Sequence, residues 1–506
     1  MLDWSLLSGP IPVVLRVSAV VAAIWLLSQT LRARRRRWVK CVDLTACLLV
    51  AAVITAVVAH LARNVWMLYP DNLEPAVYLW AAVGVFAVNL TVTRVVTERK
   101  VGRALVGLTA AVVVVGACAN QVNNIYGAYV TPRDALHMVH PDDIALRDAP
   151  SHRQLPDADP VEFHWSPPPG LTSQGKLTSA PIAAPQSGFT AREARIYLPP
   201  AYFADPQPQL PVLVLLAGQP GTPQDWLTAG KLVHIMDRFA ADHRGLAPVV
   251  VVPDATGSQF GDPLCLDSRR GNADTYLAKD VPAWVKTHLS VDPDPQSWAI
   301  AGVSYGGTCA LQLATNHPDV YPTFLDISGS AEPSLGDRPR TVADAFGGDQ
   351  AAFMRVNPLD LLRTRRYWGS AAAIVVGAGD RDTKSDAHAV YAATRAAGMT
   401  SHYIELPGSH DWRLFSARAH TRAALAGAAD RAHPADTRCE RITPTHRRSH
   451  SREVRSAMIA PDAEIRHYLH AGWIGERLEP QRDMQGVVIT HRPSSHGCSA
   501  HRCRGG

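Results

Sequence analysis

A serine between glycines lies past the middle of the chain, in the segment Gly302-Val303-Ser304-Tyr305-Gly306-Gly307. The apolar residues 297–301 before it predict a short buried strand, and the small and apolar residues 308–316 after it predict a helix. A serine at such a junction occupies a sharp turn, where side chains in place of the glycines would clash with the strand or the helix. The turn presents the hydroxyl to solvent, where a histidine could accept its proton. The spacing therefore predicts that Ser304 is a nucleophile.

A serine nucleophile needs a base to take its proton, and the base needs a carboxylate to fix its tautomer. In a strand–turn–helix arrangement of this kind, the acid and then the histidine follow the serine along the chain. Asp380 and Asp382 both follow a predicted strand; Asp380 is preferred, because Asp382 is better placed to cap the next predicted helix. His410 lies in the loop after the last predicted strand, whereas His317 is expected only to cap the helix that follows Ser304. We therefore expect a triad of Ser304, Asp380 and His410, with Asp382 as the alternative acid.

An oxyanion hole needs two backbone N–H groups, one from the residue after the serine and one from a residue after an early strand. Tyr305 supplies the first. The predicted strand Val212–Leu216 runs into Ala217-Gly218-Gln219-Pro220-Gly221, where Gln219 is the natural second donor because Pro220 has no N–H group. The alternative is that this glycine-rich segment forms only a turn.

The elements that would position these residues lie within residues 174–430. Short apolar segments predict seven strands: Ala194–Tyr197, Val212–Leu216, Val249–Val252, Trp298–Ala301, Thr323–Ile327, Ala372–Val376 and His402–Glu405. Helical stretches separate most of them, at 228–241, 274–289, 308–316 and 385–397. Strands that alternate with helices predict an α/β fold with a mostly parallel sheet covered on both faces.

The first 130 residues are a different kind of sequence. They contain four apolar segments, at 11–31, 42–61, 76–96 and 104–124, and each is long enough to cross a bilayer as a helix. The connecting segments 32–40 and 97–103 together hold nine Lys or Arg, whereas 62–75 holds one. Because basic loops stay in the cytoplasm, the chain after residue 125 is expected outside the plasma membrane. Residues 1–130 are thus predicted to be a four-span transmembrane region, and the domain that follows it in the sequence is predicted to be extracytoplasmic.

Two segments show no periodicity. Residues 131–173 are rich in Pro, Asp and His and are interpreted as a linker. Residues 431–506 are basic, rich in His and poor in apolar side chains, so we expect disorder there.

Charge and cysteine content exclude several classes of protein. The net charge of +5 arises largely from local clusters and does not indicate a nucleic-acid partner. None of the eight cysteines has the C-x-x-C spacing of a zinc or thioredoxin site. Four residues near the C-terminus match no closed zinc pattern: His496, Cys498, His501 and Cys503. The Ser–His–Asp triad needs neither a metal nor an organic cofactor, and we expect none.

Cys265 and Cys309 are the only cysteines in the predicted α/β domain. Cys309 lies five residues after Ser304, and Cys265 follows the strand Val249–Val252, which should end at the same edge of the sheet. Two cysteines close in space in an oxidising compartment favour a disulfide. The alternative is two independent buried thiols.

Together, these residues resemble the esterase D / antigen 85 branch of the α/β-hydrolases over residues 175–415. The resemblance rests on five segments: YLPPAYF (197–203), LLAGQPG (215–221), GVSYGG (302–307), GAGD (377–380) and PGSHDW (407–412). Phe415 stands where that branch often has a second tryptophan after the histidine. The branch contains carboxylesterases, feruloyl esterases, S-formylglutathione hydrolases and mycolyltransferases, all of which use a Ser–His–acid triad.

The resemblance implies specific roles: Ser304 as nucleophile, Asp380 as acid, His410 as base, and Gln219 and Tyr305 as oxyanion donors. With its four spans, the chain resembles actinobacterial membrane-anchored esterases. We therefore expect an integral membrane esterase that hydrolyses a small-molecule or lipid ester through an acyl-enzyme. One alternative is a mycolyltransferase-like acyltransferase that moves acyl groups onto cell-envelope glycans or lipids. Another is a non-catalytic envelope-binding scaffold.

Overall fold

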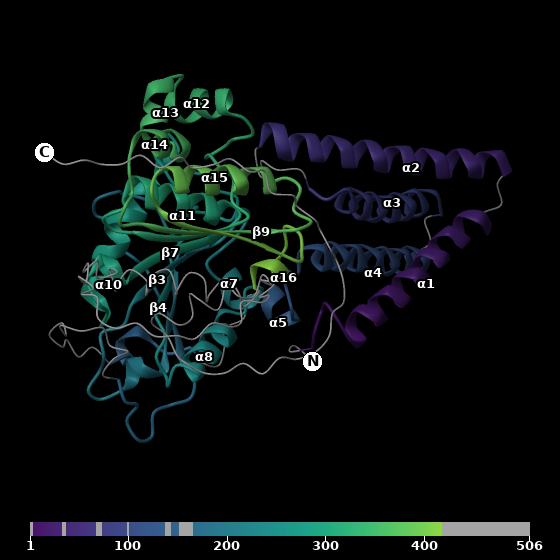
Figure 1. Ribbon diagram of the computed structural model, residues 1–506. Helices are drawn as coiled ribbons and strands as arrows, with labels where there is room; N and C mark the ends of the chain where they lie inside the picture. Colours follow the sequence, from purple (N-terminus) through teal and green to yellow (C-terminus); the bar gives the residue numbers. More distant parts are fainter. Residues whose placement is uncertain are drawn as a thin grey trace, which may run out of the picture. The chain divides into compact units, whose positions relative to one another are not determined.

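The computed structural model describes residues 4–32, 37–66, 73–98, 101–136, 143–150 and 165–416 (Figure 1). Four long helices form its N-terminal part: α1 (Pro10–Arg32), α2 (Arg37–His60), α3 (Pro75–Glu98) and α4 (Val101–Tyr126). A π-helical turn, Leu61–Val65, extends α2. All four helices are long and apolar enough to cross a membrane, at positions that match the four predicted segments.

The helix bundle buries small and apolar side chains between its members and exposes large apolar ones outside. Leu26, Ala87, Leu90 and Val114 belong to its internal core. Each helix also exposes large apolar side chains, among them Val21, Leu49, Val96 and Leu105. An apolar outer face on every helix is suited to a surrounding lipid bilayer rather than to water.

The second part of the structure is built on one eight-stranded sheet. Its strands are β1 (Lys176–Ala180), β2 (Ala194–Leu198), β3 (Val212–Leu216), β4 (Val249–Val252), β7 (Trp298–Val303), β8 (Thr323–Ile327), β9 (Ala371–Gly377) and β10 (Thr400–Leu406). The spatial order is β1-β2-β4-β3-β7-β8-β9-β10. All pairs from β4 to β10 are parallel, whereas β2 is antiparallel to both of its neighbours. The predicted, mostly parallel sheet is therefore confirmed.

Helices cover both faces of this sheet, and the central strands are buried along their whole length. On one face lie α7 (Asp225–Thr228), α8 (Leu232–Asp242) and α16 (Trp412–Phe415), which contribute to one continuous apolar core. On the other face lie α11 (Tyr305–Asn316), α14 (Pro358–Thr364) and α15 (Lys384–Ala396) (Figure 1). Burial of both faces explains why the strand sequences are continuously apolar rather than alternating.

Two predicted helices are interrupted in the structure. The predicted helix 228–241 is divided between α7 and α8 at Gly230 and Lys231, and Lys231 has a φ of 52°. A Cβ at Gly230 would lie 2.6 Å from the carbonyl oxygen of Trp226, so glycine allows the chain to turn closely here. The predicted helix 274–289 is likewise divided into α9 (Ala273–Thr275), a π-helical turn (Tyr276–Asp280) and α10 (Val281–His288).

Several short elements were not predicted from the sequence. They are the edge strand β1, the two-residue strands β5 (Asp267–Ser268) and β6 (Gly271–Asn272), the helices α5 (Pro132–Ala135), α12 (Arg338–Phe346), α13 (Gln350–Val356), α14 and α16, and the 3₁₀ turns Leu146–Asp148, Pro200–Phe203 and Pro295–Ser297. Most are too short or too polar to show a hydrophobic period.

Part of the predicted linker 131–173 packs against the sheet. The N–H of Ile144 donates to the carbonyl oxygen of Leu177 in β1 at 2.7 Å, and Arg195 of β2 donates two hydrogen bonds to Asp143, at 2.9 and 2.8 Å. These contacts cover the β1–β2 edge and extend the folded part of the chain before residue 174. The predicted tail 431–506 lies outside the described residues.

Candidate active site

Ser304 occupies a sharp turn between β7 and α11. Its backbone has φ 54° and ψ −121°, a conformation that residues with a Cβ rarely adopt. A Cβ at Gly302 would overlap the backbone of Gly306, and one at Gly306 would overlap the end of β3. The N–H of Ser304 donates to the carbonyl oxygen of Ile327 in β8 at 2.8 Å, which holds the turn against the sheet. The sequence prediction of a strained elbow is therefore matched by the backbone geometry.

Asp380 and His410 are joined directly. His410 Nδ1 lies 2.9 Å from Asp380 Oδ2, and Asp380 is only 3% exposed. Burial opposes ionisation of Asp380, but the hydrogen bond and charge of His410, with Thr383 and Ser328 nearby, outweigh it and lower the pKa of Asp380 to about 2. Asp382 is exposed, and α15 begins after Thr383 without a side-chain capping bond. The geometry thus pairs His410 with Asp380 and does not give Asp382 the predicted capping role.

The sheet brings Ser304 and this pair to the same edge. Ser304 follows β7, Asp380 follows β9 and His410 follows β10, and these strands are parallel neighbours together with β8. Parallel strands end at one edge, which we call the carboxyl edge of the sheet. The N–H of Gly379 donates to the carbonyl oxygen of Gly408 at 2.8 Å, which ties the Asp380 loop to the His410 loop.

Aromatic side chains support the His410 loop. Asp411 caps α16 by accepting hydrogen bonds from the N–H groups of Arg413 and Leu414. Phe415 packs edge-on against the His410 ring, with centroids 5.3 Å apart, and Trp412 packs edge-on against Trp226 at 5.4 Å. Phe415 therefore contacts the imidazole of His410. It does so from the position where the esterase D / antigen 85 branch often has a tryptophan.

The two predicted oxyanion donors lie on either side of the elbow. Tyr305 is the first residue of α11, so its N–H lies outside the helix hydrogen-bond ladder. A Cβ at Gly218 would lie 3.5 Å from the Cβ of Ser304, which places the loop that contains Gln219 beside the elbow. The structure thus brings the loop after β3 and the start of α11 together.

An arginine that the sequence analysis did not identify holds the loop after β3. Arg192 donates to both carboxylate oxygens of Asp254, at 2.8 and 2.7 Å, and Asp254 is 1% exposed. The same guanidinium donates to the carbonyl oxygen of Gly221 at 3.1 Å. Burial opposes ionisation of Asp254, but its bonds to Arg192 and Thr256 lower its pKa overall. No local spacing pattern marks Arg192, because its partners lie far away in the sequence.

A buried carboxyl group lies one strand from the elbow. Asp326 of β8 is 1% exposed and accepts a hydrogen bond from the N–H of Gly329 at 2.8 Å. Burial, assisted by the charge of Asp386, raises the pKa of Asp326 to about 7. The sequence analysis did not identify Asp326, because an aspartate within an apolar strand can equally mark the strand's end.

The predicted disulfide between Cys265 and Cys309 is present, with the two Cα atoms 5.5 Å apart. It joins the first turns of α11 to the loop after β4. Next to it, the N–H of Cys265 donates to the hydroxyl of Tyr305 at 3.1 Å. Burial raises the pKa of Tyr305 well above its ordinary value, so the hydroxyl stays protonated. The disulfide and this hydrogen bond together fix the loop to the elbow.

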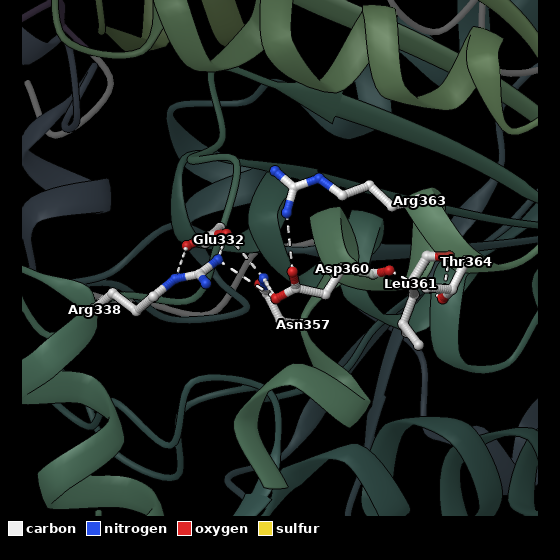
Figure 2. A network of polar contacts seen from close by, with 7 residues as sticks. All are labelled: Glu332, Arg338, Asn357, Asp360, Leu361, Arg363 and Thr364. Atoms are coloured by element: carbon white, nitrogen blue, oxygen red, sulfur yellow. Dashed lines mark hydrogen bonds and ion pairs between the residues drawn. The ribbon is translucent and has the colours of Figure 1, made fainter. Parts of the chain in front are cut away.

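A polar network fixes the segment that follows β8 (Figure 2). Glu332 accepts hydrogen bonds from Arg338 and from Asn357, the latter at 2.8 Å. Asn357 also donates to Asp360 at 2.7 Å, and Arg363 donates to Asp360 at 3.0 Å. The positive charges of two arginines thus offset the negative charges of two carboxylates. The network links the segment that follows β8 to α12 and α14.

Among the described residues, no three His, Cys, Asp or Glu side chains are grouped so that they could hold a metal ion. The cysteines and histidines at 496–503 lie outside the described residues. His317 is the C-cap residue of α11, as predicted, and its Nε2 lies 2.7 Å from Asp274.

The sheet order, the elbow after β7 and the His–Asp pair after β9 and β10 define an α/β-hydrolase. Residues 190–422 match the family model described as putative esterase. A protein of Corynebacterium glutamicum, described as uncharacterised, is 34% identical over 418 residues, which cover 81% of this chain and 93% of that relative. The chain belongs to the esterase family and is an esterase-type hydrolase, as its sequence predicted.

Several solved structures are similar to part of the chain. A ferulic acid esterase has 20% sequence identity and a TM-score of 0.43, and the match covers 51% of this chain and 99% of that one. An S-formylglutathione hydrolase from Agrobacterium tumefaciens has 20% identity and a TM-score of 0.41, with 52% and 97% covered. MPT51 from Mycobacterium tuberculosis has 17% identity and a TM-score of 0.36, with 49% and 99% covered.

Proposed function

We propose that the protein is a membrane-anchored serine esterase whose catalytic domain, residues 174–430, lies outside the plasma membrane. The observation that carries the proposal is the strained Ser304 at the same edge of the sheet as the His410–Asp380 pair. A strained serine turn is costly for a fold and is typical of a nucleophile. The esterase family match supports an ester as substrate.

In the proposed reaction, His410 acts as the base. Because an ionised carboxylate only accepts hydrogen bonds, Asp380 holds the proton of His410 on Nδ1 and leaves Nε2 as the acceptor. Nε2 takes the proton of Ser304 as its Oγ attacks the ester carbonyl carbon. The N–H groups of Gln219 and Tyr305 then stabilise the oxyanion.

Collapse of this intermediate forms the acyl-enzyme. His410 gives its proton to the leaving alkoxide, which departs as an alcohol. A water molecule, deprotonated by His410, then attacks the acyl carbonyl, and the carboxylic acid leaves while Ser304 regains its proton. The low pKa of Asp380 keeps its charge beside the imidazolium that forms twice in this cycle.

Covalent labelling tests the nucleophile. The full chain is treated with a fluorescent fluorophosphonate, which reacts with activated serines. We expect wild type and Ser330→Ala, a control serine in the loop after β8, to label, and Ser304→Ala to remain unlabelled. Equal labelling of Ser304→Ala would refute the assignment, and no labelling of wild type would favour a non-catalytic scaffold.

Two features support an extracytoplasmic catalytic domain. Basic residues concentrate in the segments 32–40 and 97–103, and disulfides form mainly in oxidising compartments. To test the orientation, a cysteine is placed at Ser173, which is exposed, in a background without Cys41 and the tail cysteines. We expect it to react with an impermeant thiol reagent in intact cells, whereas Arg34→Cys reacts only after lysis. The reverse pattern would overturn the orientation.

A further inference from the structure

The buried carboxyl group of Asp326 lies between the loops that carry the proposed nucleophile and the proposed acid. In β8, Asp326 pairs with Gly302 of β7 on one side and with Ile374 of β9 on the other. Ser304 follows β7 and Asp380 follows β9, so each of these loops leaves a strand next to β8. Asp326 is 1% exposed, and its Oδ2 atom is buried without a hydrogen-bond partner. An unpaired buried carboxyl oxygen is costly for a fold, which makes the contacts of this group informative.

No positive charge balances this carboxyl group within the described part of the chain. The charge that acts on Asp326 is that of Asp386, in the first turn of α15, and it is also negative. Together with burial, this charge raises the pKa of Asp326 to about 7, so the neutral form is far more accessible than in an exposed aspartate. Asp326 is therefore suited to accept a hydrogen bond rather than to supply a charge.

The carboxyl group packs directly against the first turn of α11. A Cβ at Gly307, three residues after Ser304, would lie 2.3 Å from Asp326 Oδ1. The N–H of Gly307 donates to the carbonyl oxygen of Ser304 at 2.8 Å, so this glycine belongs to the turn that holds the nucleophile. Glycine allows the close approach between the helix backbone and the carboxyl group. The position of Asp326 is thus coupled to that of the elbow.

The same oxygen atom holds the turn that follows β8. Asp326 Oδ1 accepts a hydrogen bond from the N–H of Gly329 at 2.8 Å. The residue before it, Ser328, has a φ of 53°, and its N–H donates to the carbonyl oxygen of Val375 in β9 at 2.8 Å. A residue with a Cβ keeps a left-handed backbone conformation only where its surroundings hold it there. The hydrogen bond from Gly329 to Asp326 therefore helps to hold Ser328 in place.

The side chain of Ser328 lies beside the proposed acid. Its hydroxyl is buried and helps to lower the pKa of Asp380. Farther along the turn, the N–H of Ser330 donates to the hydroxyl of Thr308 in α11 at 2.8 Å, and Glu332 joins the polar network of Figure 2. The segment that follows β8 is thus held by Asp326, by α11 and by that network, with the Ser328 hydroxyl beside Asp380.

We propose that Asp326 is a positioning residue of the esterase site, whose carboxyl oxygen holds the Ser328–Gly329 turn so that the Ser328 hydroxyl stays beside Asp380. The inference rests on the proposed function, because it assumes that the proposed triad is catalytic. Asp326 is too deeply buried to touch the ester, so it acts through Ser328 and through the backbone of the elbow. What the site requires from Asp326 is an acceptor for one N–H group, not a negative charge.

The experiment compares two substitutions of Asp326 in the full chain. Asp326→Asn keeps an oxygen acceptor without a charge, whereas Asp326→Ala removes the acceptor. With a p-nitrophenyl ester as substrate, we expect Asp326→Ala to lower kcat about 10-fold with little change in KM, as for the loss of one hydrogen bond, and Asp326→Asn to stay within about 3-fold of wild type. Thr323→Ala is the matched control, because it truncates another buried polar side chain at the start of β8 and should keep kcat.

A double-variant cycle tests the route through Ser328. Ser328→Ala should lower kcat by itself, and Asp326→Ala/Ser328→Ala should be no slower than Asp326→Ala, because effects that act through one contact do not add. The inference is wrong if Asp326→Ala keeps wild-type kcat, if Asp326→Asn or Thr323→Ala loses as much as Asp326→Ala, or if the two effects multiply. If Asp326→Ala does not fold, Ser328→Ala decides, since unchanged kcat in that variant also overturns the inference.

Fluorophosphonate labelling separates this inference from the proposed function. An unlabelled wild type would refute the proposed function, and this inference with it. A labelled wild type together with unchanged kcat in Asp326→Ala would refute this inference alone.

Discussion

Replacement of Asp380 by asparagine tests the acid assignment most directly. Asp380 Oδ2 lies 2.9 Å from His410 Nδ1, and the carboxylate can only accept at that bond. An amide at this position can instead donate to Nδ1, which moves the imidazole proton to Nε2. His410 could then no longer accept the proton of Ser304. We expect kcat to fall by about 10⁴, equivalent to about 5.5 kcal/mol of transition-state stabilisation.

The same substitution has a second, independent consequence for stability. Native Asp380 has a pKa of about 2, against an ordinary value of 3.8. At about 1.4 kcal/mol for each tenfold change in proton affinity, the ionised carboxylate stabilises the fold by roughly 2 to 3 kcal/mol. Because the native pKa is the lower one, this stabilisation is present above pH 3.8 and is lost as the pH falls towards 2. Asp380→Asn should therefore show a weaker decline of unfolding free energy over that range.

Asp382→Asn is the matched control, because it makes the same chemical change two residues away on an exposed side chain. Hydrolysis of a p-nitrophenyl ester by the full chain gives kcat, and urea denaturation at several pH values gives the free energy of unfolding. Asp382→Asn should keep activity within a few-fold of wild type and should keep the acid-sensitive decline. If it costs more activity than Asp380→Asn, the acid assignment is wrong.

Three further substitutions follow from described contacts. The double variant Cys265→Ser/Cys309→Ser should lower the free energy of unfolding by about 4 kcal/mol, which is the chain-entropy value for a loop closed over 44 residues. Denaturation without reductant measures this loss, and an unchanged midpoint would contradict it. Burial opposes protonation of His317, but the hydrogen bond to Asp274 outweighs burial and raises the pKa of His317. The protonated imidazole therefore stabilises the fold below pH 6.5, and this stabilisation is lost as the pH rises through the raised native pKa. The stability difference between wild type and His317→Asn should therefore shrink from pH 6 to 9, and a constant difference would contradict the pairing. Arg192→Met should lower kcat about 10-fold or more with a smaller change in KM, because the loop after β3 loses its hydrogen bond at Gly221.

The sequence was most informative where local patterns decide the structure. The central strands could be predicted because burial on both faces leaves almost nothing but apolar residues in them, as in Val249–Val252. The elbow could be predicted because side chains in place of its glycines would clash with nearby backbone, which is a local constraint. Cys265 and Cys309 could be paired because strand order places their loops at one edge of the sheet. Each of these predictions depends on a few neighbouring residues and a simple topological rule.

Other features depend on contacts that no local pattern records. Strand β1 contains only polar or small residues besides Leu177, and it forms because β2 presents an edge with which it pairs. The helices α12 and α13 are polar and short, although Asp337 and Asp349 cap their first turns and were available as signals. Arg192 reaches Asp254 across 62 residues, so only the folded chain reveals its role.

Two contacts, a disulfide and a hydrogen bond, hold the loop after β4 against the first turns of α11. The disulfide fixes Cys265 to the helix that begins directly after Ser304, and the hydroxyl of Tyr305 accepts the N–H of the same cysteine. Cys265 itself has a φ of 50°, so its backbone conformation is held by these contacts rather than by local preference. Tyr305 therefore links the disulfide, through its side chain, to the proposed oxyanion donor in its own backbone. A chain that uses a disulfide in this way is suited to an oxidising environment, which agrees with the orientation inferred independently from the basic loops.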